Sequence, residues 1–416
     1  MRTTEMDANS YQAPEAVDRY RTRALLAGVV LFLLAAALAF VLGGPVQFFR
    51  SYLVGFFFCT GLAVGGLAWL MLGHMTGGAW ALVSRRVLEA ATRTLPLLAL
   101  MFVPLVVSLF VHQDGHSLYE WSDPHHVEQD TVLQHKSVYL NIPFFIIRGV
   151  FYFLVWGALA YFMNKWSSEQ DSSGDPRIRR RMQDLSGPGI LLFGLTATFA
   201  AVDWGMSLEP HWFSTMYGLL AMAGWGLSAL AFAITVATFL SKQEGGEHVY
   251  LPTHFHDWGK LLLAMVMLYA YFAFSQFLII WSGNLPEEIS FYLRRLRGGW
   301  EYVGLAVILF HFALPFALLL SRGLKRAPRM LRRVAVLMLV MRVVDLIFLF
   351  APAAHQEGQE GFRVLDFAYH FFPMLLMTAG LGGVWLWYFF TQLKKRPLLP
   401  VGAPDLAQAL TVAEHH

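Results

Sequence analysis

Long apolar stretches of the length that crosses a lipid bilayer dominate this sequence. A spanning α-helix needs about 20 mostly apolar residues, and ten stretches of the 416-residue chain qualify. They cover approximately residues 24–42, 51–73, 95–113, 141–163, 188–206, 213–240, 258–281, 300–320, 333–353 and 371–391. Because an open strand would leave backbone groups without partners in lipid, these stretches are predicted to be helices. The alternating segments of about ten residues that mark barrel strands do not occur.

The composition supports a membrane location and limits the cofactors. Only 14% of residues are charged, against roughly 25% in soluble domains. A single cysteine, Cys59, excludes an internal disulfide, a C-x-x-C-H haem attachment and a cysteine-ligated iron–sulfur cluster. The polar residues 1–23 do not resemble a cleavable signal peptide, so we expect the first apolar stretch to be retained.

The basic residues are distributed unequally between the two sets of connections. The side that holds the N-terminus has 22 Lys and Arg, and the other side has six. Cytoplasmic connections are enriched in Lys and Arg. The distribution therefore predicts that both termini lie in the cytoplasm.

Two pairs of similar segments raise the question of an internal repeat. Asp203 and Asp345 each lie in the fourth helix of a four-helix block, and residues 118–124 resemble residues 280–286. A parallel four-helix repeat and no repeat are equally good interpretations. The predicted fold is all-α and integral to the membrane, with two four-helix bundles (helices 2–5 and 6–9) and flanking helices 1 and 10. The predicted segments are a tail 1–23, flanking helix 24–50, bundles 51–206 and 207–353, an outer loop with flanking helix 354–391, and a tail 392–416.

The connection 74–94 has a helical pattern of its own. Trp80, Val83 and Val87 recur on one face, with Arg85 and Glu89 opposite. This pattern predicts a short helix at the membrane surface with its charged face toward water.

Ionisable residues inside the spans are the main functional candidates, because charge in hydrocarbon is costly and usually faces the bundle interior. Helical rise places His311, Arg342 and Asp345 near the midplane, and Arg148 and Asp203 in the outer third. Arg342 and Asp345 are three residues apart, so they share a helix face. A structural interpretation makes Arg342–Asp345 and Arg148–Asp203 buried ion pairs, and a functional one places them on a proton route.

The two interpretations weigh differently for each residue. Arginine does not release its proton, so structure is favoured for Arg148 and Arg342. Asp203, Asp345 and His311 can exchange protons when their surroundings shift their pKa, and both interpretations stay open for them. Glu301, at the outer mouth of a span, is a further candidate on the route, although a solvated interface residue is favoured there.

Other chemistries are not supported by the sequence. A b-type haem needs paired intramembrane histidines, and His311 is alone deep in a span. Nucleotide and peptidase motifs do not occur, and the His/acid residues of loop 114–140 lack metal-ligand spacing. We expect no metal, no redox cofactor, no nucleic-acid partner and no catalysis by this chain alone.

Several motifs resemble the NrfD/PsrC-like family of membrane quinone-oxidoreductase subunits. They are Trp281-Ser-Gly-Asn-Leu-Pro-Glu-Glu288, His311-Phe-Ala-Leu-Pro-Phe316 with the basic residues after it, and Arg342-Val-Val-Asp345. The segments 77–96 and 118–121 look specifically like the ActF branch, the smaller of two such subunits in bacterial alternative complex III, a quinol:electron-acceptor oxidoreductase. The resemblance covers nearly the whole chain.

This resemblance implies a bacterial inner-membrane complex. Its other members would be a larger homologous membrane subunit, an iron–sulfur subunit and c-type haem subunits, so that haem c and iron–sulfur clusters belong to the complex and a quinol such as menaquinol is its substrate. The chain would be a scaffold in contact with lipids and a proton path. A quinone head group needs hydrogen-bond partners near the outer face, where His112, Glu120 and Glu209 are candidates. A purely structural anchor and a stand-alone secondary transporter remain alternatives.

Overall fold

The protein is almost entirely helical. The computed structural model describes residues 11–113, 116–243, 249–354 and 364–411. The elements are, in order, α1 (Ala16–Thr76), α2 (Ala79–Thr92), α3 (Leu95–Ser108), β1 (His112–Gln113), β2 (His116–Ser117), η2 (Glu120–Ser122), α4 (Pro124–Gln129), α5 (Thr131–Lys136), α6 (Ile142–Ser173), α7 (Pro176–Trp204), η3 (Met206–Leu208), α8 (Met216–Leu240), α9 (Pro252–Gly283), α10 (Pro286–Arg295), α11 (Trp300–Ala306), η5 (Val307–Ala313), α12 (Leu314–Leu320), α13 (Arg322–Arg326), α14 (Pro328–Phe350), η6 (Ala351–Ala354), α15 (Val364–Leu393) and α16 (Leu406–Thr411).

Among the described residues, nine helices are long and apolar enough to cross a membrane. The first, α1, contains two of the ten predicted stretches. A straight helix of this length would measure about 90 Å, three times the roughly 30 Å hydrocarbon core. The helix is interrupted at Gly43 and Gly44, where the backbone leaves helical geometry just before Pro45. Gly44 has φ 66°, a left-handed conformation that glycine adopts without strain.

Contacts with α15 show that α1 reverses direction at this interruption. Before it, Gly28 lies against Gly383 and Gly43 against Tyr369, so the residue numbers run in opposite directions along the two helices. After it, Gln47 donates to the Tyr369 carbonyl (3.3 Å) and Gly55 lies against Thr378, so the numbers run together. The element is therefore a helical hairpin whose two arms both pack on α15.

The first arm of α1 and α15 pack with their backbones in contact. A Cβ atom on Gly383 would lie 2.5 Å from the Gly28 Cα atom, and one on Gly380 would lie 2.6 Å from the Phe32 nitrogen. Small residues allow such close approach between membrane helices, where van der Waals packing replaces hydrophobic driving force. The first and last long helices of the chain thus form one closely packed pair.

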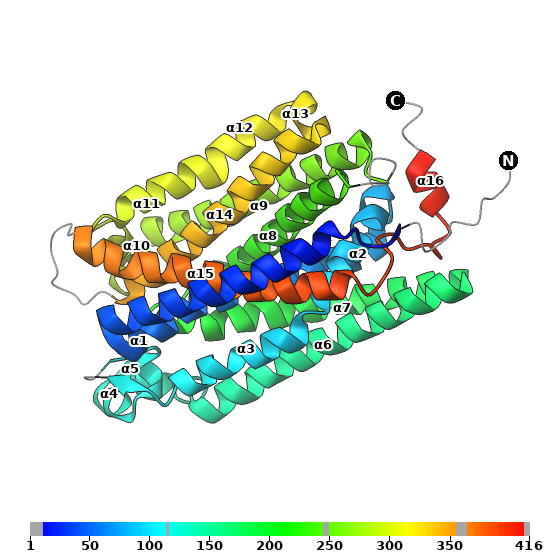
Figure 1. Cartoon of the computed structure of the whole chain (residues 1–416). Coiled ribbons are helices and arrows are strands. Elements are labelled where there is room, and N and C mark those ends of the chain that lie inside the picture. The colour runs from blue at the N-terminus through cyan, green and yellow to red at the C-terminus, as the bar shows by residue number, and fades with distance from the viewer. Residues whose placement is uncertain (1–10, 114–115, 244–248, 355–363, 412–416) are drawn as a thin grey trace.

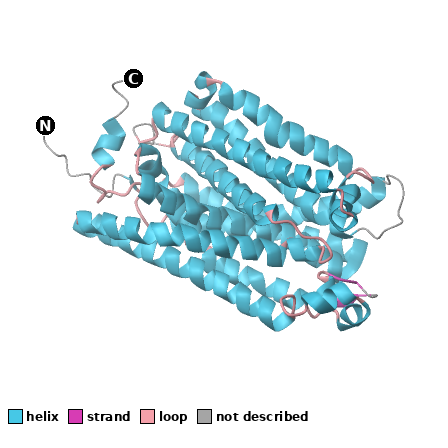
Figure 2. Cartoon of the chain, turned by 180° about the vertical axis from the view of Figure 1, so that it is seen from behind, coloured by secondary structure: helices cyan, strands magenta, loops and turns pink. Residues whose placement is uncertain are grey.

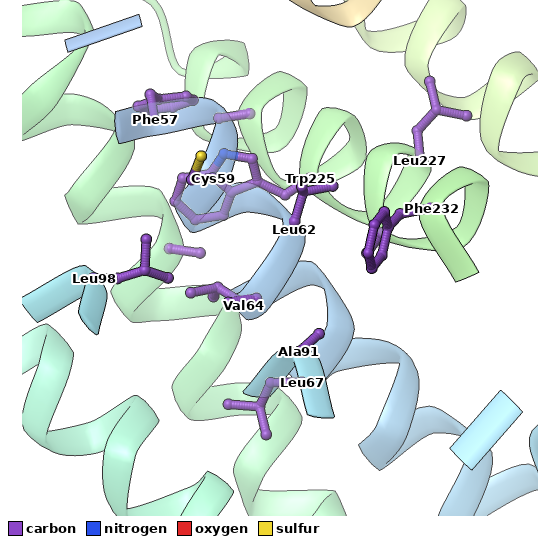
Figure 3. Close-up of a cluster of buried hydrophobic side chains, with 14 of the residues drawn as sticks. Phe57, Cys59, Leu62, Val64, Leu67, Ala91, Leu98, Trp225, Leu227 and Phe232 are labelled. Atoms are coloured by element: carbon purple, nitrogen blue, oxygen red, sulfur yellow. The ribbon is translucent and has the colours of Figure 1, made fainter. Parts of the chain in front are cut away.

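The interior lies where the second arm of α1 meets α8. Figure 3 shows Phe57, Cys59 and Leu62 of α1 beside Trp225 of α8, and these side chains are buried. Gly61 and Gly65 let α1 approach the Trp225 ring and backbone. Around this centre α6 packs on α7, and α8 packs on α9 and α14.

The two ends of the helix bundle differ. The N-terminal start of α1, α13 and α16 lie at one end, here called the terminal end, while α4, α5 and α10 lie at the opposite end (Figure 1). At the opposite end β1 and β2 form a two-residue antiparallel pair beside α4 and α5 (Figure 2). The described residues of the connection 109–141 contact the end of α7 and the segment after it, through Tyr119 to the Trp204 carbonyl and Lys136 to the Pro210 carbonyl.

The C-terminal residues are not a free tail. The Leu398 amide donates to the Tyr11 carbonyl (2.7 Å), and the Gly402 amide donates to an Asp171 carboxylate oxygen (3.4 Å). The His254 ring bonds the Ala409 carbonyl (3.1 Å). Residues 394–411 therefore connect the N-terminal segment, α6 and α9 at the terminal end. The predicted tail 1–23 is helical from Ala16, and most of the predicted outer loop 354–370 lies outside the described residues.

The prediction of a surface helix at 74–94 is correct for the helix and wrong for its environment. Residues 79–92 form α2, but every residue from Val83 to Thr92 is buried, Arg85 and Glu89 included. The charged face is covered by α6 and the C-terminal segment, which supply the polar partners that water was expected to supply.

Candidate functional site

Four side chains from three consecutive membrane-length segments meet in the second half of the chain. The Tyr269 hydroxyl of α9 donates to an Asp345 carboxylate oxygen on α14 (2.5 Å) and accepts from Arg342 (3.0 Å), which also pairs with Asp345. His311, in η5, lies edge-on to the Tyr269 ring with centroids 4.8 Å apart. We call Tyr269, His311, Arg342 and Asp345 the α14 cluster. It brings together three of the sequence-predicted residues.

The side chains of the α14 cluster are buried, but several of their nitrogen atoms have no hydrogen-bond partner in the described residues. Its four side chains are all buried, His311 and Arg342 at 1% exposure each. Within the described part of the chain, both ring nitrogens of His311 have no hydrogen-bond partner, nor do Nε and Nη2 of Arg342. Buried polar atoms of this kind are uncommon and call for an explanation. The cluster therefore keeps unpaired nitrogen atoms that can bind a mobile proton or a chain of water molecules.

Local backbone structure determines where the cluster lies. Residues 307–313 form a π-helical segment, an irregularity that is frequent at functional sites. On the other side, α8 offers Gly224 to the Arg342 guanidinium, since a Cβ there would lie 2.3 Å from the Arg342 Cζ atom. Gly224 is therefore a positioning residue for Arg342.

A second cluster joins α6 and α7 in the first half of the chain. Arg148 binds both carboxylate oxygens of Asp203 through Nε and Nη2, each at 2.8 Å, and the Tyr152 hydroxyl donates to the same carboxylate (2.7 Å). Nη1 of Arg148 donates to the Tyr139 carbonyl (2.9 Å). We call Arg148, Tyr152 and Asp203 the α7 cluster.

The two clusters contain the same kinds of side chain but differ in how completely the polar atoms are hydrogen-bonded. Each has one aspartate, one arginine and one tyrosine, with the tyrosine hydroxyl donating to the carboxylate. In the α7 cluster the bidentate arginine and the tyrosine satisfy the carboxylate, a geometry typical of a strong structural pair. The α14 cluster adds an imidazole and leaves several nitrogens unbound. The α14 cluster is therefore better suited to proton exchange.

A third charged cluster, which the sequence did not reveal, lies at the terminal end. Glu89 on α2 pairs with Arg85 (3.0 Å) and Arg86 (2.6 Å) and accepts from the Ser167 hydroxyl of α6 (2.5 Å). Arg86 also pairs with Asp171. Beside it a pocket of about 540 Å³ is lined in part by His74, Arg85, Gln170, Arg179 and Asp405.

At the opposite end a pocket includes one of the three predicted quinone-binding residues, Glu120. Glu120 lines a pocket of about 360 Å³ together with Arg50, Ser117 and apolar side chains that include Phe350. Glu209 is buried and bound by Arg295 (2.6 Å) and Arg294 (3.3 Å). His112 is exposed on β1.

Glu301 belongs to neither aspartate cluster. Its carboxylate accepts from the Gly299 amide (2.9 Å), next to the start of α11. This contact stabilises the first turn of the helix, where a negative charge also favours the helix dipole. The structure gives Glu301 a capping contact and no contact with His311, Arg342 or Asp345.

A polar contact fastens the connection 109–141 to the segment between the two halves of the chain. Asp130 accepts from the backbone amides of Val132 (2.8 Å) and Leu133 (3.2 Å) at the start of α5, and contacts the His211 ring (2.5 Å). Partial burial works to raise the pKa of Asp130, but the hydrogen bonds from His211 and from the two amides outweigh it and lower the pKa.

A carboxyl group with a lowered folded-state pKa stabilises the fold above its unfolded pKa of about 4, and that contribution is lost as the pH falls through the folded value. We therefore expect the contact to hold from pH 7 down to about pH 4 and to weaken below it. Asp130→Asn is expected to loosen α4 and α5 already at pH 7, because the charged acceptor is gone. Hydrogen exchange over residues 124–136 measures this. Equal protection in the variant and the parent chain would contradict it, and Glu128→Gln, an exposed carboxyl on α4, is the control.

No protein-family model matches the chain, and no curated protein matches it either.

Proposed function

We propose that this chain is a membrane subunit of a respiratory quinol:electron-acceptor oxidoreductase, that it acts as a scaffold, and that it conducts protons coupled to quinol oxidation. The α14 cluster is the observation that carries the proton path. It holds a phenol that donates to a carboxylate and lies against an imidazole ring, buried among helices long enough to span a membrane. These are side chains that exchange protons, and ionisable groups inside a membrane are costly and mark functional sites.

The proposed route uses the cavities at both ends. The terminal-end pocket, whose lining includes His74 and Gln170, offers an entrance. The opposite-end pocket with Arg50 and Glu120 offers an exit. Asp345 and His311 form the proton-exchange point between the two pockets, and Tyr269 links the Asp345 carboxylate to Arg342. Asp203 belongs to the separate α7 cluster in the first half of the chain.

The redox chemistry is assigned to partners. We propose that the chain carries no redox cofactor, because one cysteine cannot hold a cluster and His311 is the sole histidine deep in a span. Haem c and iron–sulfur subunits, together with a larger homologous membrane subunit of the NrfD/PsrC-like family, would oxidise the quinol. The resemblance to the ActF branch of alternative complex III supports this assembly, with both termini in the cytoplasm of a bacterial inner membrane.

If quinone also binds this chain, Glu120 is the candidate that the geometry favours. It shares its pocket with the Arg50 side chain and with apolar residues such as Phe350 and Met374. A polar head group with an apolar tail fits a concave site with few polar groups and apolar walls. His112 and Glu209 are less suitable, the first because it does not line this pocket and the second because arginines already bind it.

Purification tests this assignment. A tagged full-length chain, extracted from its native membrane in mild detergent, is expected to bring with it subunits that contain covalent haem and iron–sulfur clusters, together with quinol-oxidising activity. Isolation as a solitary protein without haem absorbance would overturn the assignment and favour a secondary transporter. A purely structural anchor would co-purify in the same way and is separated by proton measurements.

A further inference from the structure

The most uneven charge distribution in the chain lies around α13. Between residues 322 and 333 there are six basic residues and no acidic one. The basic stretch at the start of α7 is different, because residues 165–184 contain five basic and four acidic residues. The charges around α13 therefore require neutralisation from outside this segment. The six are Arg322, Lys325, Arg326, Arg329, Arg332 and Arg333.

The rest of the described chain does not neutralise them. None of the six forms an ion pair with a described carboxylate. On α9, against which α13 packs, Asp257 already pairs with Lys260 (3.0 Å), and His256 lies within electrostatic reach of Lys260, Lys325 and Arg326. By contrast, Arg86 and Arg179 at the same end each pair with an aspartate.

Packing holds two of these side chains in place. Lys325 is only 8% exposed. Its aliphatic stem lies on Gly259 of α9, where a Cβ would come within 2.6 Å of the Lys325 Cγ atom. Nε of Arg326 is buried and has no hydrogen-bond partner in the described residues. Basic side chains that bury their aliphatic stems against apolar surface are typical of membrane interfaces.

Apolar surface continues directly from the basic residues. Leu320, two residues before Arg322, is 58% exposed, and Met330, which follows Arg329, is 47% exposed. Both belong to helices of membrane length that run away from the terminal end (Figure 1). The cations at the helix end suit the anionic headgroup of a phospholipid, and the exposed apolar face beside them suits its acyl chains.

We propose that α13 and the first turns of α14 form a binding site for anionic phospholipid, with Lys325, Arg326 and Arg329 around the headgroup phosphate and the acyl chains along Leu320 and Met330. Basic residues near a membrane surface each favour anionic lipid, and arginine can bind phosphate through two parallel hydrogen bonds. An acidic protein would find the same charges but would leave the adjoining apolar face uncovered. The site requires membrane insertion and does not depend on proton conduction.

Lipid binding to the full-length chain tests the site. The protein, purified in mild detergent, is mixed with phosphatidylglycerol or phosphatidylcholine at equal concentrations, and bound lipid is measured by native mass spectrometry. We expect about tenfold preference for phosphatidylglycerol. The combined variant Lys325→Gln, Arg326→Gln and Arg329→Gln is expected to lose that preference. The matched control, Arg177→Gln, Arg180→Gln and Arg181→Gln, removes the same charge at the start of α7 and is expected to keep it.

Further controls separate loss of lipid binding from loss of folding and from unspecific binding. The α13 variant must unfold at the same temperature as the parent chain in phosphatidylcholine, and Lys325→Arg must retain the preference, because both check that folding is intact. Equal binding of the two lipids by the parent chain would overturn the proposal and favour an acidic protein partner. If the α7 control variant lost the preference for phosphatidylglycerol equally, the preference would reflect unspecific electrostatic attraction and not a site at α13. Inorganic phosphate that displaces the lipid at equal concentration would show a free-anion site instead.

Discussion

Asp345→Asn in the intact assembly is expected to abolish proton translocation while quinol oxidation continues. The side chain keeps its shape and can still accept a hydrogen bond from Tyr269, but an amide neither ionises nor carries the proton. The buried hydroxyl and the unbound His311 nitrogens then have no carboxylate with which to exchange. Protons moved per electron, measured in sealed vesicles with an external pH indicator, are expected to fall to the value that the redox chemistry alone produces.

Asp203→Asn is the matched variant, since it makes the same replacement in the other cluster. Its carboxylate is fully occupied by Arg148 and Tyr152, so we expect it to affect stability more than proton movement. Co-purification of all subunits with each variant confirms that assembly is intact. An unchanged proton-to-electron ratio in the Asp345 variant would remove the proton path and leave the structural anchor.

Arg148→Met is expected to destabilise the first half of the chain by about 3–5 kcal/mol, since it leaves the Asp203 carboxylate buried without its counter-charge. Asp203 is 0% exposed, so water cannot replace the guanidinium. The effect is measured as a shift in reversible unfolding of the full-length chain by sodium dodecyl sulfate in mixed micelles.

The double variant Arg148→Met with Asp203→Leu distinguishes loss of the pair from loss of packing. Replacing both members of a buried pair by apolar residues of similar size is often nearly neutral, so we expect the double variant to recover most of the stability. A double variant as unstable as the single one would contradict the pairing argument. Arg180→Met, at an exposed position that forms no ion pair with a described carboxylate, is expected to change stability by less than about 0.5 kcal/mol.

The positions of the apolar helices were largely readable from the sequence, because hydropathy over about 20 residues is a local property. Arg342 and Asp345 were also predictable as a pair, since residues three apart share a helix face. The hairpin inside α1 was predictable as two spans, although not as one interrupted helix. The structure describes nine membrane-length helices, and the grouping into two four-helix bundles stays a prediction.

Contacts between segments that lie far apart in the sequence were harder to predict. Tyr269 completes its cluster from another helix, and nothing in the pattern of a membrane helix distinguishes it from a lipid-facing tyrosine. Tyr152 shares a face of α6 with Arg148, but the sequence does not show that it reaches Asp203 on α7. The π-helical segment around His311 leaves no signature in hydropathy. For α2, the helical period revealed a polar face but not what covers it, so Glu89 was placed toward water although Arg86, Ser167 and the C-terminal segment enclose it.

The backbone contact between the first arm of α1 and α15 has a consequence for biosynthesis. The chain is made from its N-terminus, so the first arm enters the membrane hundreds of residues before its partner exists. Until α15 emerges, Gly28 and its neighbours face lipid without the surface that fits them. Closure of this helix pair therefore belongs to the end of folding, and a ribosome that stops early leaves the first arm without its α15 partner.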